Sequence, residues 1–200
     1  MGNVTKSQPS TILSPNGNSL AVFVDGITGI IKLKDVQGNI EPLSNYNPNS
    51  LYGSFYDTTT QIALGNNTPT PMTYNTTDFS NGISIVNNSR ISVSQSGIYN
   101  IQFSAQLDRV SGSGVVAIDI WLRKNGQNVA NTNTKVTMTG NSNQSKIVAS
   151  WNFFVSLNAG EYAELYWNTP TTNIVLLYEA ENLIIPHPAT PSIILTAVKI

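Results

Sequence analysis

The chain of 200 residues lacks cysteine, has a single histidine and carries few charged side chains. Without cysteine it can form neither a disulfide framework nor a thiol nucleophile. One histidine, His187, is too few for the usual zinc sites built from several His and Cys ligands. No Gly-x-Ser-x-Gly motif supplies a serine that this histidine could activate. We therefore interpret His187, between Pro186 and Pro188, as an ordinary loop residue.

Charge of either sign is scarce. Lys and Arg number 10, Asp and Glu 11, and the net charge is −1. A nucleic-acid partner would require a basic stripe that displaces counterions from phosphates, and none is present. The apolar runs at 182–185 and 193–195 are far shorter than the roughly 20 residues of a spanning helix. We expect neither a nucleic-acid partner nor a membrane partner, and no secretory signal is visible in Met1–Ser10.

The acidic residues are scattered along the chain, which argues against catalysis. Glu161 and Glu164 stand at i and i+3, on opposite faces of one strand, so they are not a glycosidase pair. Glu179 and Glu181 share a strand face before a loop, where they would contact a cation or a sugar or simply remain solvated. The sequence predicts a non-enzyme with no catalytic residue, no cofactor and no metal.

Alternation with a period of two residues replaces any helical period, and such alternation predicts strands with one buried face. It is clearest after Gly97 and recurs before Lys124-Asn125-Gly126, where Asn-Gly favours a tight hairpin turn. The buried sets are Tyr99, Ile101, Phe103, Ala105 and Leu107; Val116, Ile118, Ile120 and Leu122; and Ile147, Ala149, Trp151, Phe153, Val155 and Leu157. Further strands are expected at Glu161–Trp167 and Ser192–Ile200, with weaker ones at 51–64, 82–86, 90–93 and 128–138.

Eight to ten short strands with turns every 8–15 residues predict an all-β, antiparallel jelly-roll sandwich. We assign residues 49–200 to this head and residues 1–48 to an N-terminal arm and β-hairpin. The hairpin is expected over Leu20–Val24 and Ile30–Lys34, with the turn at Asp25–Gly29 and a linker at 45–50. The polar stretch Met1–Asn18 and the small hairpin are too weak to be stable alone, so we expect a partner to order them.

Two strands carry apolar residues on the face that should be solvated, which predicts a second surface to bury. We expect a subunit interface formed by Val148, Phe154, Ile194, Val198 and Ile200. Trp121 is also out of phase with its strand, beside Asp119 and Arg123. It is either covered by a loop or part of a contact surface.

The motifs "SGIYNIQFSAQL", "IDIWLRKNG", "FFVSLNAGEYAELYW" and "PSIILTAVKI" resemble the tumour necrosis factor and complement globular-head superfamily. The resemblance covers residues 51–200 and includes Gly97 and Tyr99, the Lys-Asn-Gly turn, and the turn at Leu157, Gly160 and Glu161. It implies a compact trimer with the last strand near the threefold axis. The fold serves many functions, so it implies no particular activity.

The segment "NSLAVFVDGITGIIKLKDVQGNIEPLSNY" resembles the short hairpin module at the start of many tailed-phage structural proteins, and the head resembles those of phage virion proteins. Animal relatives usually have a signal peptide, cysteines or a collagen-like stalk, and none of these features is seen in this sequence. The expected function is therefore a homotrimeric capsid decoration (cement) protein on the virion exterior. It would bind the major capsid protein or another virion protein through Leu20, Val22, Phe23, Val24, Ile30 and Leu33. The alternatives are a fibre tip that recognises a host-surface glycan or protein and a secreted bacterial adhesin.

Overall fold

The structure is a computed structural model that describes residues 6–7, 13–15, 17, 19–43, 51–142 and 145–200. The chain divides into two units, Met1–Asn49 and Ser50–Ile200. Each unit is described by itself. The predicted linker at 45–50 and most of the predicted arm at 1–18 lie outside the described residues.

The first unit is a small sheet in the order β1-β2-β3-β4. Its strands are β1 (Lys6–Ser7), β2 (Ala21–Asp25), β3 (Ile31–Lys34) and β4 (Ile40–Pro42). The β2–β3 pair is antiparallel, with Val22 opposite Leu33. In the turn between them, the Asp25 carboxylate accepts hydrogen bonds from the backbone N–H groups of Ile27 (2.8 Å) and Thr28 (2.9 Å) and from Lys32 Nζ (2.7 Å).

The pKa of Asp25 lies well below its ordinary value, because the hydrogen bond from Lys32 and those from the two backbone N–H groups stabilise the carboxylate. Gly29 closes the turn at φ 70°, a conformation that glycine adopts without a steric penalty. The turn joins the antiparallel strands β2 and β3.

The second unit, the head, consists of two seven-stranded sheets. One has the order β6-β17-β11-β18-β5-β8 with β15 paired to β11; the other has the order β13-β12-β16-β10-β9 with β14 on β12 and β7 on β16. The strands are β5 (Tyr52–Asp57), β6 (Gln61–Ile62), β7 (Thr70–Pro71), β8 (Thr76–Asn81), β9 (Ile83–Val86), β10 (Arg90–Val93), β11 (Gly97–Arg109), β12 (Val116–Lys124), β13 (Gln127–Asn128), β14 (Thr134–Met138), β15 (Lys146–Leu157), β16 (Tyr162–Asn168), β17 (Ile174–Leu176) and β18 (Ile193–Lys199).

The connections between the two sheets define a jelly roll. The chain crosses from one sheet to the other between β6 and β7, β7 and β8, β8 and β9, β10 and β11, β11 and β12, β14 and β15, β15 and β16, and β16 and β17. The predicted all-β, antiparallel jelly roll is confirmed in this form. The head has more strands than the eight to ten expected, because β6, β7, β13 and β17 are too short to show alternation and β8 was not predicted.

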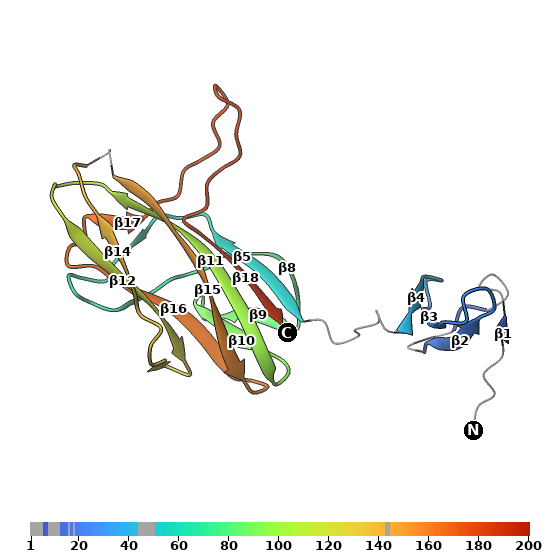
Figure 1. Cartoon of the computed structure of the whole chain (residues 1–200). Coiled ribbons are helices and arrows are strands. Elements are labelled where there is room, and N and C mark those ends of the chain that lie inside the picture. The colour runs from blue at the N-terminus through green and yellow to red at the C-terminus, as the bar shows by residue number, and fades with distance from the viewer. Residues whose placement is uncertain (1–5, 8–12, 16, 18, 44–50, 143–144) are drawn as a thin grey trace. The chain divides into compact units, whose positions relative to one another are not determined.

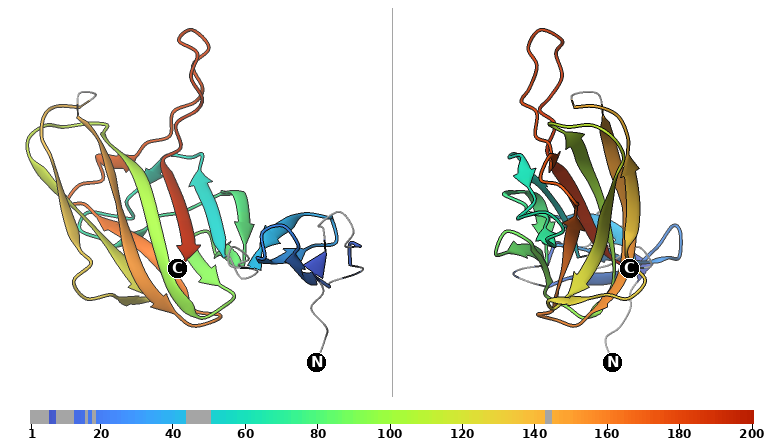
Figure 2. Two further views of the ribbon diagram at one scale, coloured as in Figure 1. Left: turned by 45° about the vertical axis from the view of Figure 1, so that its right-hand side comes forward. Right: turned by 90° about the vertical axis from the view of Figure 1, so that its left-hand side faces the viewer.

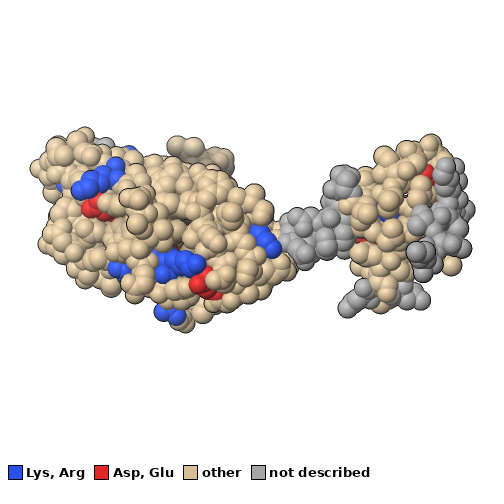
Figure 3. Space-filling view, turned by 60° about the horizontal axis from the view of Figure 1, so that its bottom comes forward, with Lys and Arg blue, Asp and Glu red and all other residues tan. Residues whose placement is uncertain are grey.

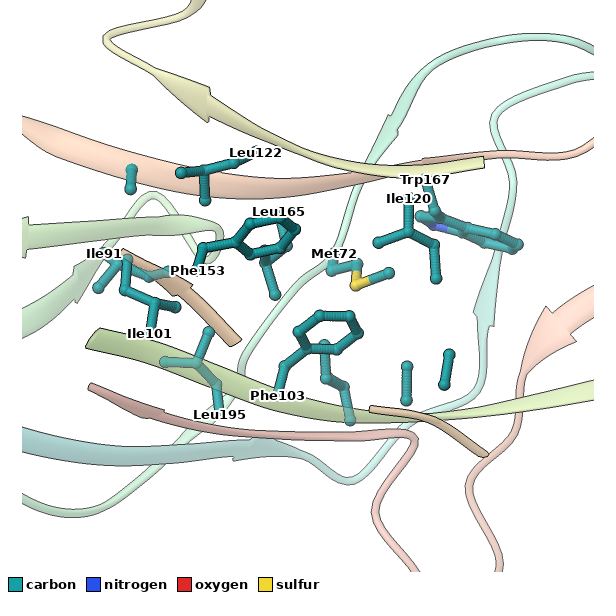
Figure 4. Close-up of a cluster of buried hydrophobic side chains, with 14 of the residues drawn as sticks. Met72, Ile91, Ile101, Phe103, Ile120, Leu122, Phe153, Leu165, Trp167 and Leu195 are labelled. Atoms are coloured by element: carbon teal, nitrogen blue, oxygen red, sulfur yellow. The ribbon is translucent and has the colours of Figure 1, made fainter. Parts of the chain in front are cut away.

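The core lies between the sheets and consists of the alternating residues that the sequence indicated. Tyr99, Ile101, Phe103, Ile120 and Leu122 are almost completely buried. Figure 4 shows the last four of these side chains within the cluster. The ring of Phe103 lies 4.7 Å from Trp151 and 6.3 Å from Phe153, between centroids. Along β11, β12 and β15 the predicted inward phase is confirmed, because each strand hides one apolar face and leaves the other outside.

The two turns that carry the family resemblance are bonded to each other. Asn125 (φ 49°) and Gly126 (φ 79°) form the predicted tight turn after β12. The Glu161 carboxylate accepts hydrogen bonds from the backbone N–H of Asn158 (2.7 Å) and from Asn125 Nδ2 (2.8 Å), and it pairs with Lys124 Nζ at 2.7 Å. These contacts, led by the one to Asn158, lower the pKa of Glu161 to about 2. Glu161 is therefore a structural link.

Between β17 and β18 the chain forms a projecting arm, residues 177–192, that extends away from both sheets (Figures 1 and 2). The arm has two bridges, Glu179 with Thr190 and Asn182 with His187. At its tip Leu183, Ile184 and Ile185 are 82%, 93% and 70% exposed. The prolines at 186 and 188 predicted a loop here, but the sequence predicted neither β17 nor the projection.

Candidate functional site

The outer face of the sheet containing β11 combines apolar and neutral polar side chains in register. Across β15, β11, β18 and β5, one row is Phe154, Asn100, Val198 and Tyr52, the next is Asn152, Gln102, Thr196 and Ser54, and the third is Ser150, Ser104, Ile194 and Tyr56. None of these side chains is charged. The five residues expected at a subunit interface are all exposed: Val148 55%, Phe154 63%, Ile194 39%, Val198 42% and Ile200 71%.

Two further aromatic side chains extend this surface beyond the predicted residues. Tyr52 is 41% exposed and Phe79 on β8 is 56% exposed. Their rings meet edge to face with centroids 6.0 Å apart. We call the exposed apolar set Tyr52, Phe79, Val148, Phe154, Ile194, Val198 and Ile200 the sheet face. Phe79 was missed because the strand β8 was not predicted, whereas Tyr52 lies on β5, within the expected strand at 51–64, but was not assigned to the interface.

The residues proposed for attachment separate into two groups within the N-terminal unit. Phe23 and Leu33 are almost fully buried there, so these side chains hold the small sheet together and do not form an exposed contact surface. Leu20, Val22 and Ile30 are 38%, 58% and 47% exposed, and Val24 is half-buried. The exposed apolar surface also includes Ile27 and Ile31.

The opposite face of the head, outside the sheet containing β12 and β16, is built from stacked aromatic and cationic groups. The Arg123 guanidinium lies 4.0 Å from the centre of the Tyr166 ring, and Arg90 lies 4.5 Å from that of Tyr162. Trp121 packs beside Tyr166 with centroids 5.9 Å apart. Its Nε1 donates a 2.8 Å hydrogen bond to Asn128 Oδ1, which also accepts one from Arg123 Nε. The Trp121 side chain is half-buried, and these contacts hold its ring in place.

A hollow of about 770 Å³ opens beside this ring. Its walls include Asp119, Trp121, Asn128, Asn131, Asn133 and Asn168. The carboxylate of Asp119 accepts a 2.8 Å hydrogen bond from Asn133 Nδ2 and lies 3.6 Å from Lys135 Nζ. The side-chain oxygen of Asn168 has no hydrogen-bond partner among the described residues. The phase of Trp121 on its strand, beside Asp119, predicted a contact surface or a covering loop but not the hollow, which also requires residues 128–133 and Pro69.

The remaining candidate residues form no common centre. His187 is exposed on the projecting arm, with Nδ1 2.9 Å from the carbonyl oxygen of Pro188. Glu179 pairs with Lys146, whose pKa it raises through their hydrogen bond. Glu164 is buried, accepts a 2.7 Å hydrogen bond from Ser89 Oγ and lies 3.8 Å from Arg90 Nε.

In the described part of the chain, no three His, Asp or Glu side chains gather as a metal site would require. Those same residues contain no helix long and apolar enough to cross a membrane. Charged groups on the face shown in Figure 3 are few and scattered among neutral residues.

No protein-family model and no curated protein matches the chain. Among solved structures, the chain is similar to the globular domain of zebrafish complement 1qA protein, at 12% identity over 76% of this chain and 96% of that one, with a TM-score of 0.41. It is also similar to murine APRIL at pH 8.0, at 12% identity over 76% and 99% of the two chains, with a TM-score of 0.45. A second murine APRIL structure, at pH 8.5, gives 10% identity, the same coverage and a TM-score of 0.44.

Proposed function

We propose that this protein is a virion structural component, a homotrimeric capsid decoration (cement) protein on the capsid exterior. Its head would form the trimer, and its N-terminal unit would bind the major capsid protein or another virion protein. The observation that carries the proposal is the sheet face, an exposed apolar surface whose neighbours in the same rows are uncharged. The virion assignment itself rests on the motif resemblance described above.

The sheet face supports the trimer because it is apolar where a monomer would be polar. An exposed apolar patch of several neighbouring side chains on a small domain indicates an interaction surface. Here Phe154, Val198 and Tyr52 lie in one hydrogen-bonded row, with neutral amides and hydroxyls between the apolar groups. Burying such a surface costs no desolvation of charge, which suits a permanent interface.

The N-terminal unit supports attachment because it hides little apolar surface of its own. Phe23 and Leu33 are its only fully buried apolar side chains among the described residues. Val22, Ile27 and Ile30 remain exposed on the same small sheet. A unit this small buries too little apolar surface to be more than marginally stable, and contact with a capsid surface would bury these side chains.

Binding to capsids that lack the protein tests both parts. The full chain should be trimeric by light scattering and should decorate the particles, as counted by cryo-EM. A chain beginning at Ser50 should remain trimeric but fail to bind. Val22→Asp with Ile30→Asp should also prevent binding, whereas Val86→Asp, an equally exposed change on β9, should leave it intact. Capsid binding by the Ser50 chain at full affinity would contradict the attachment role.

A fibre tip or receptor-binding head is the second candidate function. The hollow beside Trp121 favours it, because a recognition protein needs a shaped surface that a purely structural protein does not. Cryo-EM of intact particles separates the two functions, since a decoration protein covers the capsid lattice and a tip protein occurs at the ends of fibres.

A further inference from the structure

We infer that the hollow beside Trp121 is a binding site for a neutral carbohydrate, with the indole ring as its platform. The inference does not depend on the virion assignment, because every residue of the hollow lies in the head. A pyranose presents a face of C–H groups and a rim of hydroxyls. It is therefore recognised by a flat apolar ring with hydrogen-bonding side chains around it, and these are the groups that surround the hollow.

The indole ring is held in place before any ligand arrives. Its Nε1 is occupied by Asn128, and Tyr166 supports it from within the same sheet. The Arg123 guanidinium stacks on Tyr166 at 4.0 Å and also lies over the indole ring, 6.0 Å from its centroid, so it further fixes the position of the ring. A ring fixed in this way contacts a sugar without losing further side-chain freedom, which favours binding.

The polar groups of the hollow are predominantly side-chain amides, contributed by Asn128, Asn131, Asn133 and Asn168. An amide both donates and accepts, so it matches a sugar hydroxyl in either role. The side-chain oxygen of Asn168 is buried, so it contributes no reachable acceptor to the hollow.

The charge of the hollow favours a neutral ligand. Its two charged side chains, Asp119 and Lys135, lie 3.6 Å apart and offset each other. A nucleic acid or a sulfated polymer would require uncompensated basic groups along its path. The basic residue that lines the hollow, Lys135, is paired with Asp119. A neutral oligosaccharide meets no such requirement.

The rim of the hollow is also fixed. The backbone N–H of Val129 donates to the Leu122 carbonyl at 3.0 Å, and Thr132 Oγ1 bonds both the Val129 carbonyl (2.8 Å) and the Leu122 N–H (3.2 Å). Asn131 adopts φ 63° at the bend, a conformation that asparagine tolerates better than most residues. These bonds tie the 128–133 loop to β12, so the amides reach the hollow from a fixed backbone.

The test uses the full chain and a printed array of neutral and anionic oligosaccharides, followed by saturation-transfer NMR and titration of tryptophan fluorescence with each hit. At least one neutral oligosaccharide should bind. Trp121→Ala should weaken that binding by about tenfold or more, and Trp121→Phe, which keeps a smaller ring, should recover part of it. Asn133→Ala should also weaken it, whereas the matched change Asn158→Ala, at an exposed asparagine after β15 that lines neither the hollow nor the sheet face, should not.

Melting curves of each variant show whether the head is still folded. Asn133 is exposed, so its variant tests the site even if Trp121→Ala is poorly folded. The inference is overturned if no neutral glycan binds up to about 10 mM, the weak end of useful affinity. Hits that are all anionic, or neutral binding unchanged in both Trp121→Ala and Asn133→Ala, would overturn it as well. Because these measurements need no capsid, their failure is distinct from failure of the decoration role.

Discussion

Phe154→Asp is the most direct probe of the sheet face. The side chain is 63% exposed in the single chain, so almost two thirds of its surface is available for burial by a second protomer. Complete burial of a phenylalanine contributes about 1.5–3 kcal/mol, so the exposed part corresponds to about 1–2 kcal/mol per protomer. Three copies bring this to about 3–6 kcal/mol per trimer, before any cost of placing a carboxylate in an apolar interface.

Because 1.4 kcal/mol is a factor of ten, Phe154→Asp should weaken trimer association by about a hundredfold at the least. Light scattering over a dilution series measures the change in mass directly. In the single chain the substituted side chain points to solvent, so the monomer should melt within a few degrees of the parent. Val86→Asp, 43% exposed on the other sheet, is the matched control. A trimer that dissociates at the same concentration in both variants would refute the assignment of this face.

Three further predictions test the interior and the turns. Glu161→Gln should lower the melting temperature at pH 7 but not near pH 2. The folded pKa of about 2 lies below the unfolded value of about 4.3, so the stabilisation by the carboxylate is complete above the unfolded pKa and is lost as the pH falls towards 2. Glu181→Gln on the projecting arm should show no such dependence of the melting temperature on pH. Tyr74→Phe should be neutral or stabilising, because the buried Tyr74 hydroxyl has no hydrogen-bond partner among the described residues. Tyr99→Phe loses a 2.6 Å hydrogen bond to the Gln95 carbonyl and should lower the free energy of unfolding in urea by about 1 kcal/mol. His187→Ala should change the free energy of unfolding by less than about 0.5 kcal/mol, and a hydrolase activity dependent on this residue would contradict the non-enzymatic interpretation.

Local alternation was enough to predict the long strands. On β11 the residues from Tyr99 to Leu107 alternate without interruption, and the buried face follows from that pattern alone. Phe154 and Val198 could likewise be assigned to the outside from their phase. Their meeting across Asn100 could not, because it depends on which strands pair.

The parts that escaped prediction depend on contacts distant in sequence. β17 is three residues long, and only its pairing with β11 and β6 makes it a strand. The hollow beside Trp121 likewise combines β12, a loop near residue 131 and Pro69 from an earlier connection. Trp121 itself gave a usable signal, since an aromatic ring out of phase on an amphipathic strand points away from the core.

The projecting arm makes the head a natural carrier for foreign peptides. Its tip at Ile184 is 93% exposed and takes part in neither sheet. The strands on either side, β17 and β18, are both held by β11, so their spacing does not depend on what the arm contains. Doubling the length of such a loop costs only about 0.6 kcal/mol in closure entropy. An epitope grafted at residue 184 would thus be displayed in as many copies as the head itself.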